Sequence, residues 1–283
     1  SNHSSAPAMP ARIHSRRNHM QALGKGAHGQ EVRELQIRLN SQGSRLEVDG
    51  WYGAATEQAV ARLQRRAGLV VNGVAGDATQ AALRGQRDPR GLREADLLDA
   101  ADRLRLPPPS LKAFCEAEAE DAGFLPDGSA RILLERHIAY RQALKAGLDA
   151  NRIASRHPEL CKPIRGGYQS PSAEWERFRR LATVAGETVA VESCLWGLYR
   201  LPGFLWQELG YTDARSFRAE MERDEARQLD GLVRLLSARP ALLQTLRERR
   251  WRATARIRQG PAWLDSLYDA RLAAAHDRAR RLA

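Results

Sequence analysis

The 283-residue sequence lacks the features that mark disulfide-stabilised, zinc-binding and membrane-spanning proteins. Its three cysteines, Cys115, Cys161 and Cys194, are odd in number and irregularly spaced, which argues against a disulfide framework and a zinc site. No stretch approaches the ~20 apolar residues that a transmembrane helix requires. The polar, basic N-terminus has no apolar core, so no secretory signal is expected. We therefore expect buried thiols, no metal, no cofactor and synthesis in a cytoplasm.

Lysine is also scarce, although the chain is strongly basic. The formal net charge is +11, yet only four of the 45 basic residues are lysines. Such a charge implies an anionic partner, which could be nucleic acid, a membrane surface or an acidic polymer such as a bacterial wall. No basic-aromatic module supports nucleic acid. Arginines crowd residues 247–258 and 271–281, where they either form a solvated face balanced by nearby acids or attract an anionic surface.

Strand signals are nearly absent, and helical periods dominate. We expect helices at 92–106, 175–185, 216–237, 240–255 and 263–282, and a further helix that starts at Ser110 as its N-cap. A short β-hairpin is expected near Phe124–Leu134. The predicted fold is mainly α, with a small helical domain followed by a larger, α-rich domain. The predicted boundaries are an arm at 1–25, the small domain at 26–85, a linker at 86–94 and the large domain at 95–283.

Two segments of the small domain echo each other. Residues 48–56 and 71–79 both run from a hydrophobic residue through an Asp-Gly or Asn-Gly turn and a second glycine to a threonine. Glycine suits positive φ and Asp or Asn tolerates it, so both segments are predicted turns that enter helices, with Thr56 and Thr79 as caps. By itself, this internal repeat indicates two turns that each precede a helix of a small bundle.

This module resembles the peptidoglycan-binding domain type 1 family. The resemblance covers Gly26 to Gln36, Asp49 to Thr56 and Gly68 to Thr79, nearly the whole family pattern. It implies a three-helix wall anchor whose shallow groove, near Asp49, Trp51 and Tyr52, takes a muropeptide. Either aromatic residue could equally belong to the core, and we expect one of the two to be exposed.

An acidic helix end carries the candidate chemistry. Residues 116–121 hold four acids before Gly123, a good helix stop. Glycoside cleavage needs a carboxylic acid that stays protonated, and partial burial favours that form. Glu118 lies four residues after Phe114 and continues the apolar stripe of its helix, whereas Glu116 and Glu120 point elsewhere. An acidic helix end is also a common solvated face, so the pattern by itself is suggestive.

The segment is similar to the N-acetylmuramidase family of phage endolysins. The matching residues are Glu116–Ala119, Gly123–Gly128, Leu134–Tyr140, His157–Leu160, Gly166–Tyr168, Ser193 with Trp196–Gly197, Gly210–Tyr211 and Gly260–Pro261. The resemblance spans about 95–280 and implies a lysozyme-like, α-rich catalytic domain. It implies that Glu118 is the catalytic acid and that Asp127, Tyr168, Ser193, Trp196 and Tyr199 contact substrate or order water.

The chain departs from the family at several polar positions. Leu195, Arg200, Arg258 and Gln259 replace the family's Ser, Gln, Tyr and Asn, which suggests a more cationic cleft. Glu135 and His137 look like a metal or catalytic pair, but a helix-end salt bridge with Arg136 is the favoured interpretation. With one acid evident, Asp127 is the candidate to orient the attacking water, and such a mechanism would fit the inverting type.

These features predict a peptidoglycan hydrolase that cleaves the β-1,4 bond between N-acetylmuramic acid and N-acetylglucosamine. A monomer is expected, with peptidoglycan as partner, an anionic outer-membrane surface as a second candidate and no nucleic acid. The enzyme is expected to act on the periplasmic wall after release from the cytoplasm. A non-catalytic or retuned wall-binding protein and a wall-degrading antibacterial toxin are the alternatives.

Overall fold

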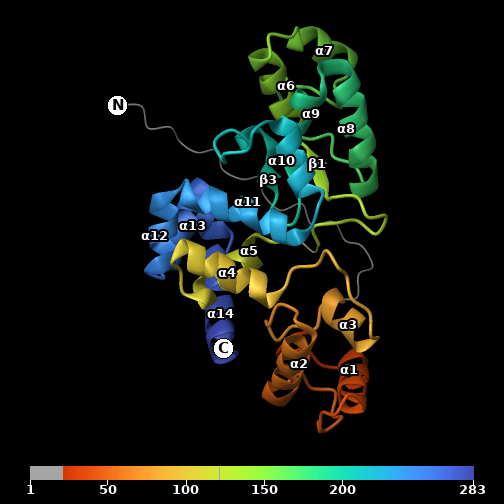
Figure 1. The fold of residues 1–283 in the computed structure, drawn as a ribbon, viewed down its shortest axis with the longest axis vertical. Helices are drawn as coiled ribbons and strands as arrows, with labels where there is room; N and C mark the ends of the chain where they lie inside the picture. The colour runs from red at the N-terminus through yellow and green to blue at the C-terminus, as the bar shows by residue number, and fades with distance from the viewer. Residues whose placement is uncertain (1–21, 121) are drawn as a thin grey trace. The chain divides into compact units, whose positions relative to one another are not determined.

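A computed structural model describes residues 22–120 and 122–283, and it is predominantly helical (Figure 1). The predicted arm at 1–25 falls mostly outside these residues. Contacts divide the chain into two compact units, residues 1–117 with 241–283 and residues 118–240. No helix within the described part is long and apolar enough to cross a membrane. The mainly helical fold with one small sheet confirms the predicted fold class.

The small N-terminal domain is a three-helix bundle. Val32, Leu35 and Val60 face inward at helical spacing and pack into one core with Tyr52, which precedes the second helix. Leu23 joins that core and pairs with Ala75, so the domain includes residues before the expected boundary at 26. The helices are α1 (Gln30–Ser41), α2 (Ala54–Ala67) and α3 (Asp77–Leu83).

The predicted threonine caps of this domain are wrong. Helices α2 and α3 begin after Gly53 and Gly76, which adopt the same φ of −89° and ψ of −169°. Thr56 and Thr79 lie inside the first helical turns and are buried. Their hydroxyl groups accept hydrogen bonds from buried glutamines, and this tertiary contact explains the threonines that resembled caps.

The rest of the first unit is helical. Ser110, the predicted cap, lies within α5 and is buried, because the helix already begins at Pro108, and proline is tolerated in a first turn. Leu282 packs on Ala61 and Val71 of the small domain. The helices are α4 (Glu94–Leu104), α5 (Pro108–Glu118), α12 (Pro240–Arg247), α13 (Trp251–Gln259) and α14 (Tyr268–Arg281), with a 3₁₀ segment η2 (Gly260–Asp265) between the last two. Of the residues in these helices, only Glu118, the last of α5, and Pro240, the first of α12, belong to the second unit.

The second unit surrounds a small antiparallel sheet of order β1–β2–β3. Ile132 pairs with Trp196 and Leu134 with Cys194, while an isolated bridge joins Phe124 to Ala130, in the predicted hairpin region. The strands are β1 (Ile132–Leu134), β2 (Cys194–Trp196) and β3 (Leu201–Pro202). The helices are α6 (Arg136–Lys145), α7 (Ala150–Arg156), α8 (Pro171–Ala185), α9 (Glu187–Glu192), η1 (Gly203–Leu205), α10 (Ala214–Met221) and α11 (Glu225–Ser237).

Three predicted helices are interrupted. The helix expected at 216–237 is two helices, because Asp224 caps the second through the Arg227 N–H and ends the first period. The helix expected at 240–255 breaks before Trp251, where Arg249 adopts a φ of 55°. The segment expected at 263–282 begins as 3₁₀ helix and becomes α-helical at Tyr268.

Candidate active site

Glu118 is the last residue of α5 and is 9% exposed. Phe114, one turn earlier, is fully buried, so the two side chains continue one buried stripe as the spacing predicts. Glu116 points to the other side, where its side chain is exposed and pairs with Arg278. The carboxyl group of Glu118 is therefore held mostly out of water at the C-terminal end of a helix.

The segment that follows Glu118 is fastened to the turn between β2 and β3. The Glu120 N–H donates to the Leu198 carbonyl at 2.8 Å. The Glu120 carboxylate lies 2.7 Å from Nε of Arg200, one of the residues that depart from the family pattern. Arg200 adopts a φ of 52°, so this turn presents a cation from a backbone conformation uncommon for arginine. Glu120 is therefore part of an ion pair beside the acid, not a freely solvated charge.

A buried glutamine that the sequence analysis did not single out holds the same region. Gln228 on α11 accepts the Leu198 N–H at 2.8 Å and donates to the carbonyls of Met221 and Gly123 at 2.8 and 3.3 Å. A Cβ on Gly123 would lie 2.1 Å from its Oε1, and one on Gly197 would lie 2.5 Å from its Cδ. Both motif glycines thus make room for this amide. The sequence feature that could have identified Gln228 is its position among the apolar residues on one side of α11.

Asp127 lies on an exposed turn of the hairpin region. Its Oδ1 accepts the N–H and the hydroxyl hydrogen of Ser129 at 2.9 and 2.5 Å. These hydrogen bonds lower the pKa of Asp127, so the carboxylate is charged over most of the pH range. One oxygen holds the turn, and the exposed group retains capacity to accept from water.

Glu135, His137 and Tyr168 form a second polar cluster. The Tyr168 hydroxyl donates to Oε2 of the buried Glu135 at 2.7 Å, and Nδ1 of His137 lies 3.2 Å from the same oxygen. Burial and the nearby Arg165 and Arg141 lower the pKa of His137 to about 4. The histidine is therefore neutral near pH 7, and the short distance is not a salt bridge.

The predicted salt bridge with Arg136 is also wrong. Arg136 donates to the carbonyls of Ile164, Arg165 and Pro158, at 2.8, 2.8 and 3.3 Å, and so fixes the loop that carries Tyr168. Among the described residues no cluster offers three His, Cys, Asp or Glu side chains to a metal. The cluster orders a loop, and Tyr168, which is half-buried, remains near the surface.

Three predicted substrate contacts lie inside the second unit. Trp196 is fully buried and donates from Nε1 to the Val191 carbonyl at 3.0 Å. The Ser193 hydroxyl donates to the Val189 carbonyl, and Tyr199 is buried as well. These side chains have the surroundings of a core, with Trp196 edge-to-face against Trp175, Phe178 and Phe217.

The groove of the small domain is organised by Gln36. Its amide accepts the Gly50 N–H and donates to Oδ1 of Asp49 and the Trp51 carbonyl, at 2.9, 2.9 and 3.1 Å. Trp51 is 53% exposed and stacks near His28, whereas Tyr52 is buried and donates to the Gly73 carbonyl. Trp51, Asp49, His28 and Arg33 line a surface hollow of about 430 Å³.

The fold and these sites together define a two-part protein. A three-helix module with an exposed aromatic hollow precedes an α-rich domain that carries a nearly buried glutamate at a helix end. A family model described as a putative peptidoglycan binding domain matches residues 28–83, and one described as N-acetylmuramidase matches residues 107–280. The second match covers more than half of the chain, which therefore belongs to the N-acetylmuramidase family.

One solved structure is similar over nearly the whole chain, and two curated relatives are similar over about a fifth of it. The crystal structure of a Burkholderia AP3 phage endolysin is 41% identical and superposes with a TM-score of 0.89 over 92% of this chain and all of that one. A zinc D-Ala-D-Ala carboxypeptidase of Streptomyces albus G is 45% identical over 60 residues, which are 20% of this chain and 24% of the relative. The N-acetylmuramoyl-L-alanine amidase CwlL of Bacillus licheniformis is 47% identical over 64 residues, 22% and 18% of the two chains. The chain thus matches a quarter or less of these two curated relatives.

Proposed function

We propose that this protein hydrolyses the β-1,4 bond between N-acetylmuramic acid and N-acetylglucosamine in peptidoglycan, with Glu118 as general acid. The observation that carries the proposal is a carboxyl group at the end of α5, 9% exposed, in a chain of the N-acetylmuramidase family. Proton donation to the leaving oxygen needs such a group. The likeness to a phage endolysin supports bacterial lysis as the outcome.

The test is Glu118→Gln, because glutamine keeps the shape but has no proton to give. We expect a loss of at least about 10² in the rate of sacculus digestion, with unchanged melting and wall binding. Glu116→Gln is the matched control on the same helix, since its exposed ion pair is worth little. Digestion by Glu118→Gln at the wild-type rate would overturn the assignment. If wild-type protein releases no fragments from sacculi, the non-catalytic alternative holds.

The masses of the released fragments define the bond that is cut. A reducing-end muramic acid identifies a muramidase, a reducing-end glucosamine a glucosaminidase, and anhydro ends a transglycosylase. Free stem peptides would instead indicate the activity of the amidase relative, which shares only the wall-binding module. We expect reducing-end muramic acid. A wall-degrading toxin would release the same ends, and only its delivery into a competitor would distinguish it.

For the attacking water we propose Asp127. Its charged, exposed carboxylate can accept a proton or a hydrogen bond from water. Asp127→Asn should lower kcat with little change in KM, while Ser129→Ala serves as the control for the turn. Equal losses in both variants would assign Asp127 a structural role. Tyr168 is the remaining surface candidate for sugar contact, tested by Tyr168→Phe.

We propose that the small domain anchors the enzyme through Trp51 and Asp49, within the hollow of about 430 Å³. Tethering raises the enzyme concentration on its polymer. The segment 22–85 should then co-sediment with sacculi, and removing it should weaken lysis without abolishing it. We further propose a monomer that acts on the periplasmic wall and meets an anionic outer-membrane surface, with arginine-rich C-terminal stretches in support.

A further inference from the structure

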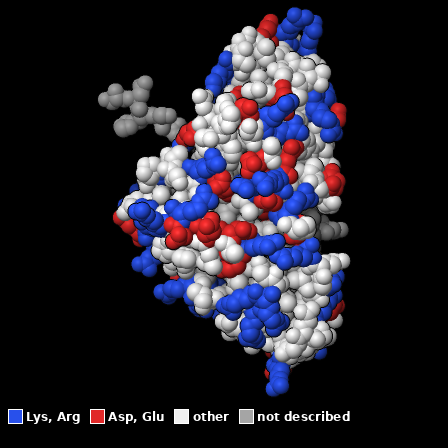
Figure 2. All heavy atoms as spheres, viewed as in Figure 1, with Lys and Arg blue, Asp and Glu red and all other residues white. Residues whose placement is uncertain are grey.

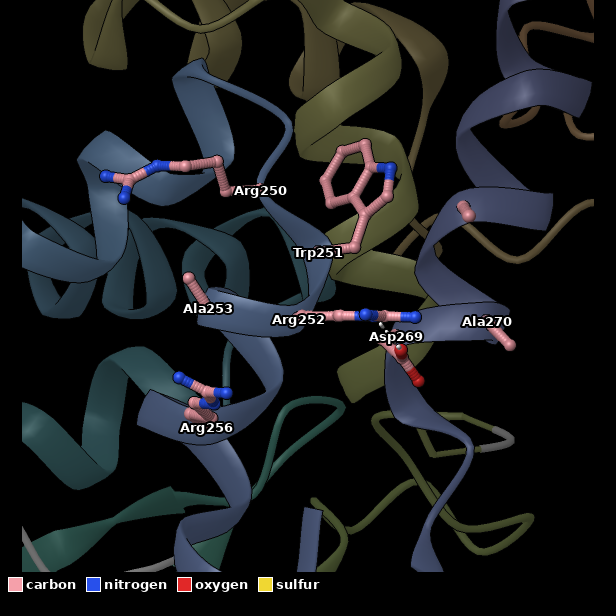
Figure 3. Close-up of a pocket in the computed structure, with 8 residues that line it drawn as sticks. Arg250, Trp251, Arg252, Ala253, Arg256, Asp269 and Ala270 are labelled. Atoms are coloured by element: carbon pink, nitrogen blue, oxygen red, sulfur yellow. Dashed lines mark ion pairs between the residues drawn. The ribbon is translucent and has the colours of Figure 1, made fainter. Parts of the chain in front are cut away.

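The exposed face of α13, η2 and the start of α14 has a composition that catalysis does not explain. A hollow of about 530 Å³ lies on it, lined by Trp251, Arg252, Arg256 and alanines of α14 (Figure 3). Arg252 is 83% exposed, and its Nε lies 3.9 Å from Oδ2 of Asp269, a distant pair. Charge on this face is therefore largely available to solvent.

The start of α13 adds to the positive potential. No acidic residue occurs in Arg249–Gln259, and no side chain caps the helix in the described structure. Unpaired first-turn N–H groups and the helix dipole favour an anion at this end. By contrast, Arg278 and Arg281 near the C-terminus pair with Glu116 and Glu57. Arg252 and Arg256 of α13 keep exposed guanidinium groups, whereas Arg278 and Arg281 are paired with acids.

Exposed aliphatic side chains occur in the same stretch of chain as these arginines. Leu264 is 69% exposed and Leu267 67%, and Ile257 is exposed one residue after Arg256. Leu267 also adopts a φ of 51°, a conformation that leucine adopts only at a cost. Sugars are bound by flat aromatic faces and polar groups, whereas exposed leucines beside arginines and tryptophan are typical of segments that lie in a membrane interface.

We propose that this lipid-facing surface, defined as Arg252, Arg256, Ile257, Leu264 and Leu267, binds the phosphate headgroups of an anionic membrane. The arginines pair with phosphate oxygens, and the leucines and isoleucine enter the boundary between headgroups and acyl chains. The guanidinium of Arg256 lies 5.3 Å from the Trp263 ring centre, which holds the arginine beside η2. The inference rests on the proposed outer-membrane contact and not on Glu118.

The experiment is sedimentation of the full chain with vesicles of phosphatidylglycerol and phosphatidylethanolamine, compared with pure phosphatidylcholine. We expect binding only to the anionic vesicles, fading between 0.1 and 1 M salt as the Debye length falls from ~10 Å to ~3 Å. Leu264→Ser with Leu267→Ser, and separately Arg252→Gln with Arg256→Gln, should each weaken the partition at least about tenfold. Digestion of lipid-free sacculi should be unchanged in both.

The matched control is a second basic region with comparably exposed aliphatics, changed by Leu144→Ser with Ile164→Ser. This control should bind vesicles as the wild type does. Loss of binding in the control but not in the α13 variants would place the surface at Leu144 and Ile164 and refute this one. If the wild type binds no anionic vesicle, the outer-membrane contact itself fails, while sacculus digestion still reports on the enzyme. Binding to sacculi lost with the α13 variants would make the surface a wall contact instead.

Discussion

Two regions of this protein are built around a buried glutamine, and they use it for different ends. Gln36 clamps the loop of Asp49 and Gly50 and leaves Trp51 exposed. Gln228 clamps Gly123 to the turn at Leu198 in the unit that begins with Glu118. An amide can accept and donate at once, so one side chain satisfies several backbone groups of two loops. Hydrogen bonds hold the loops in both regions, but one loop presents an exposed aromatic side chain and the other follows the helix that ends at Glu118.

The small domain contains an internal control for this comparison. Gln64 accepts the Asn72 and Gly73 N–H groups and donates to the Asn72 side chain, the Val74 carbonyl and the Thr79 hydroxyl. Gln36 repeats this pattern one motif earlier. Val74 stands where Trp51 stands, and Leu282 approaches Gly73 closely. The repeated scaffold thus carries a candidate ligand site only once.

The largest effect is expected for Gln228→Leu. The Leu198 N–H and the Gly123 and Met221 carbonyls lose their partner in a buried site, where each orphaned group costs roughly 1–3 kcal/mol. We expect the free energy of unfolding to fall by about 3 kcal/mol or more, measured by urea titration, with a lower kcat. Gln228→Glu keeps the acceptor for the Leu198 N–H but sets a buried carboxyl group against the Met221 and Gly123 carbonyls, so it should be destabilised as well. A free energy of unfolding unchanged from the wild type in both variants would contradict the role of the amide.

The second-largest difference between the two regions is expected in how their stability changes at acidic pH. The pKa of His137 is lowered to about 4, below its ordinary 6.5, so the unfolded chain binds the proton first as pH falls. Stability contributed by neutral His137 is full above pH 6.5 and is lost as pH drops toward 4, by up to about 3 kcal/mol. The pKa of Asp49 is lowered, so its carboxylate stays charged to lower pH.

Melting curves at pH 7 and pH 4.5 test this difference. His137→Gln should flatten the decline for the full chain, and the segment 22–85 should melt at nearly the same temperature at both values. If the melting temperature falls equally for the wild type and His137→Gln, other groups are responsible for the pH dependence of stability.

Wall binding should depend on Trp51 and not on its counterpart. Trp51→Ala truncates an exposed aromatic anchor and should remove on the order of 1–2 kcal/mol of binding free energy, or roughly tenfold in affinity for sacculi. Val74→Ala, at the equivalent place of the second loop, should leave binding unchanged. Soluble glycan fragments should be cleaved normally by both variants. Equal weakening in the two variants would indicate that both loops bind the wall.

The smallest effect is expected at the ion pair between Glu120 and Arg200. Its side chains are partly exposed, and such pairs contribute about 1 kcal/mol or less. Arg200→Gln, which restores the residue typical of the family, should lower the melting temperature by a few degrees and change kcat less than tenfold. Arg200→Lys should behave like the wild type. A larger loss than that of Gln228→Leu would make the ion pair, not the amide, the main support of the acid loop.

Some features of the site could be predicted from the sequence, and others could not. The spacing from Phe114 to Glu118 placed the acid on the buried side of its helix, because helical periodicity is a local property. Trp196 and Tyr199 lie in the core although they match a family motif, because a motif does not state which way a strand faces. His137 and Glu135 looked like an ion pair, but burial among arginines makes the histidine neutral.

The sequence by itself determined the helical class, the two functional modules, the turns of the small domain and Glu118 as the candidate acid, since periodicity, glycine positions and motif spacing are encoded locally. Tertiary structure alone decided which glutamines clamp the loops, that Trp51 and not Tyr52 is exposed, and that two predicted helices are interrupted around Asp224 and Arg249. It also set Arg252 and Arg256 along one hollow (Figure 3), and it intersperses basic and acidic side chains over the visible face of the molecule (Figure 2). Burial and hydrogen bonding depend on partners distant in the chain, and no local pattern specifies them.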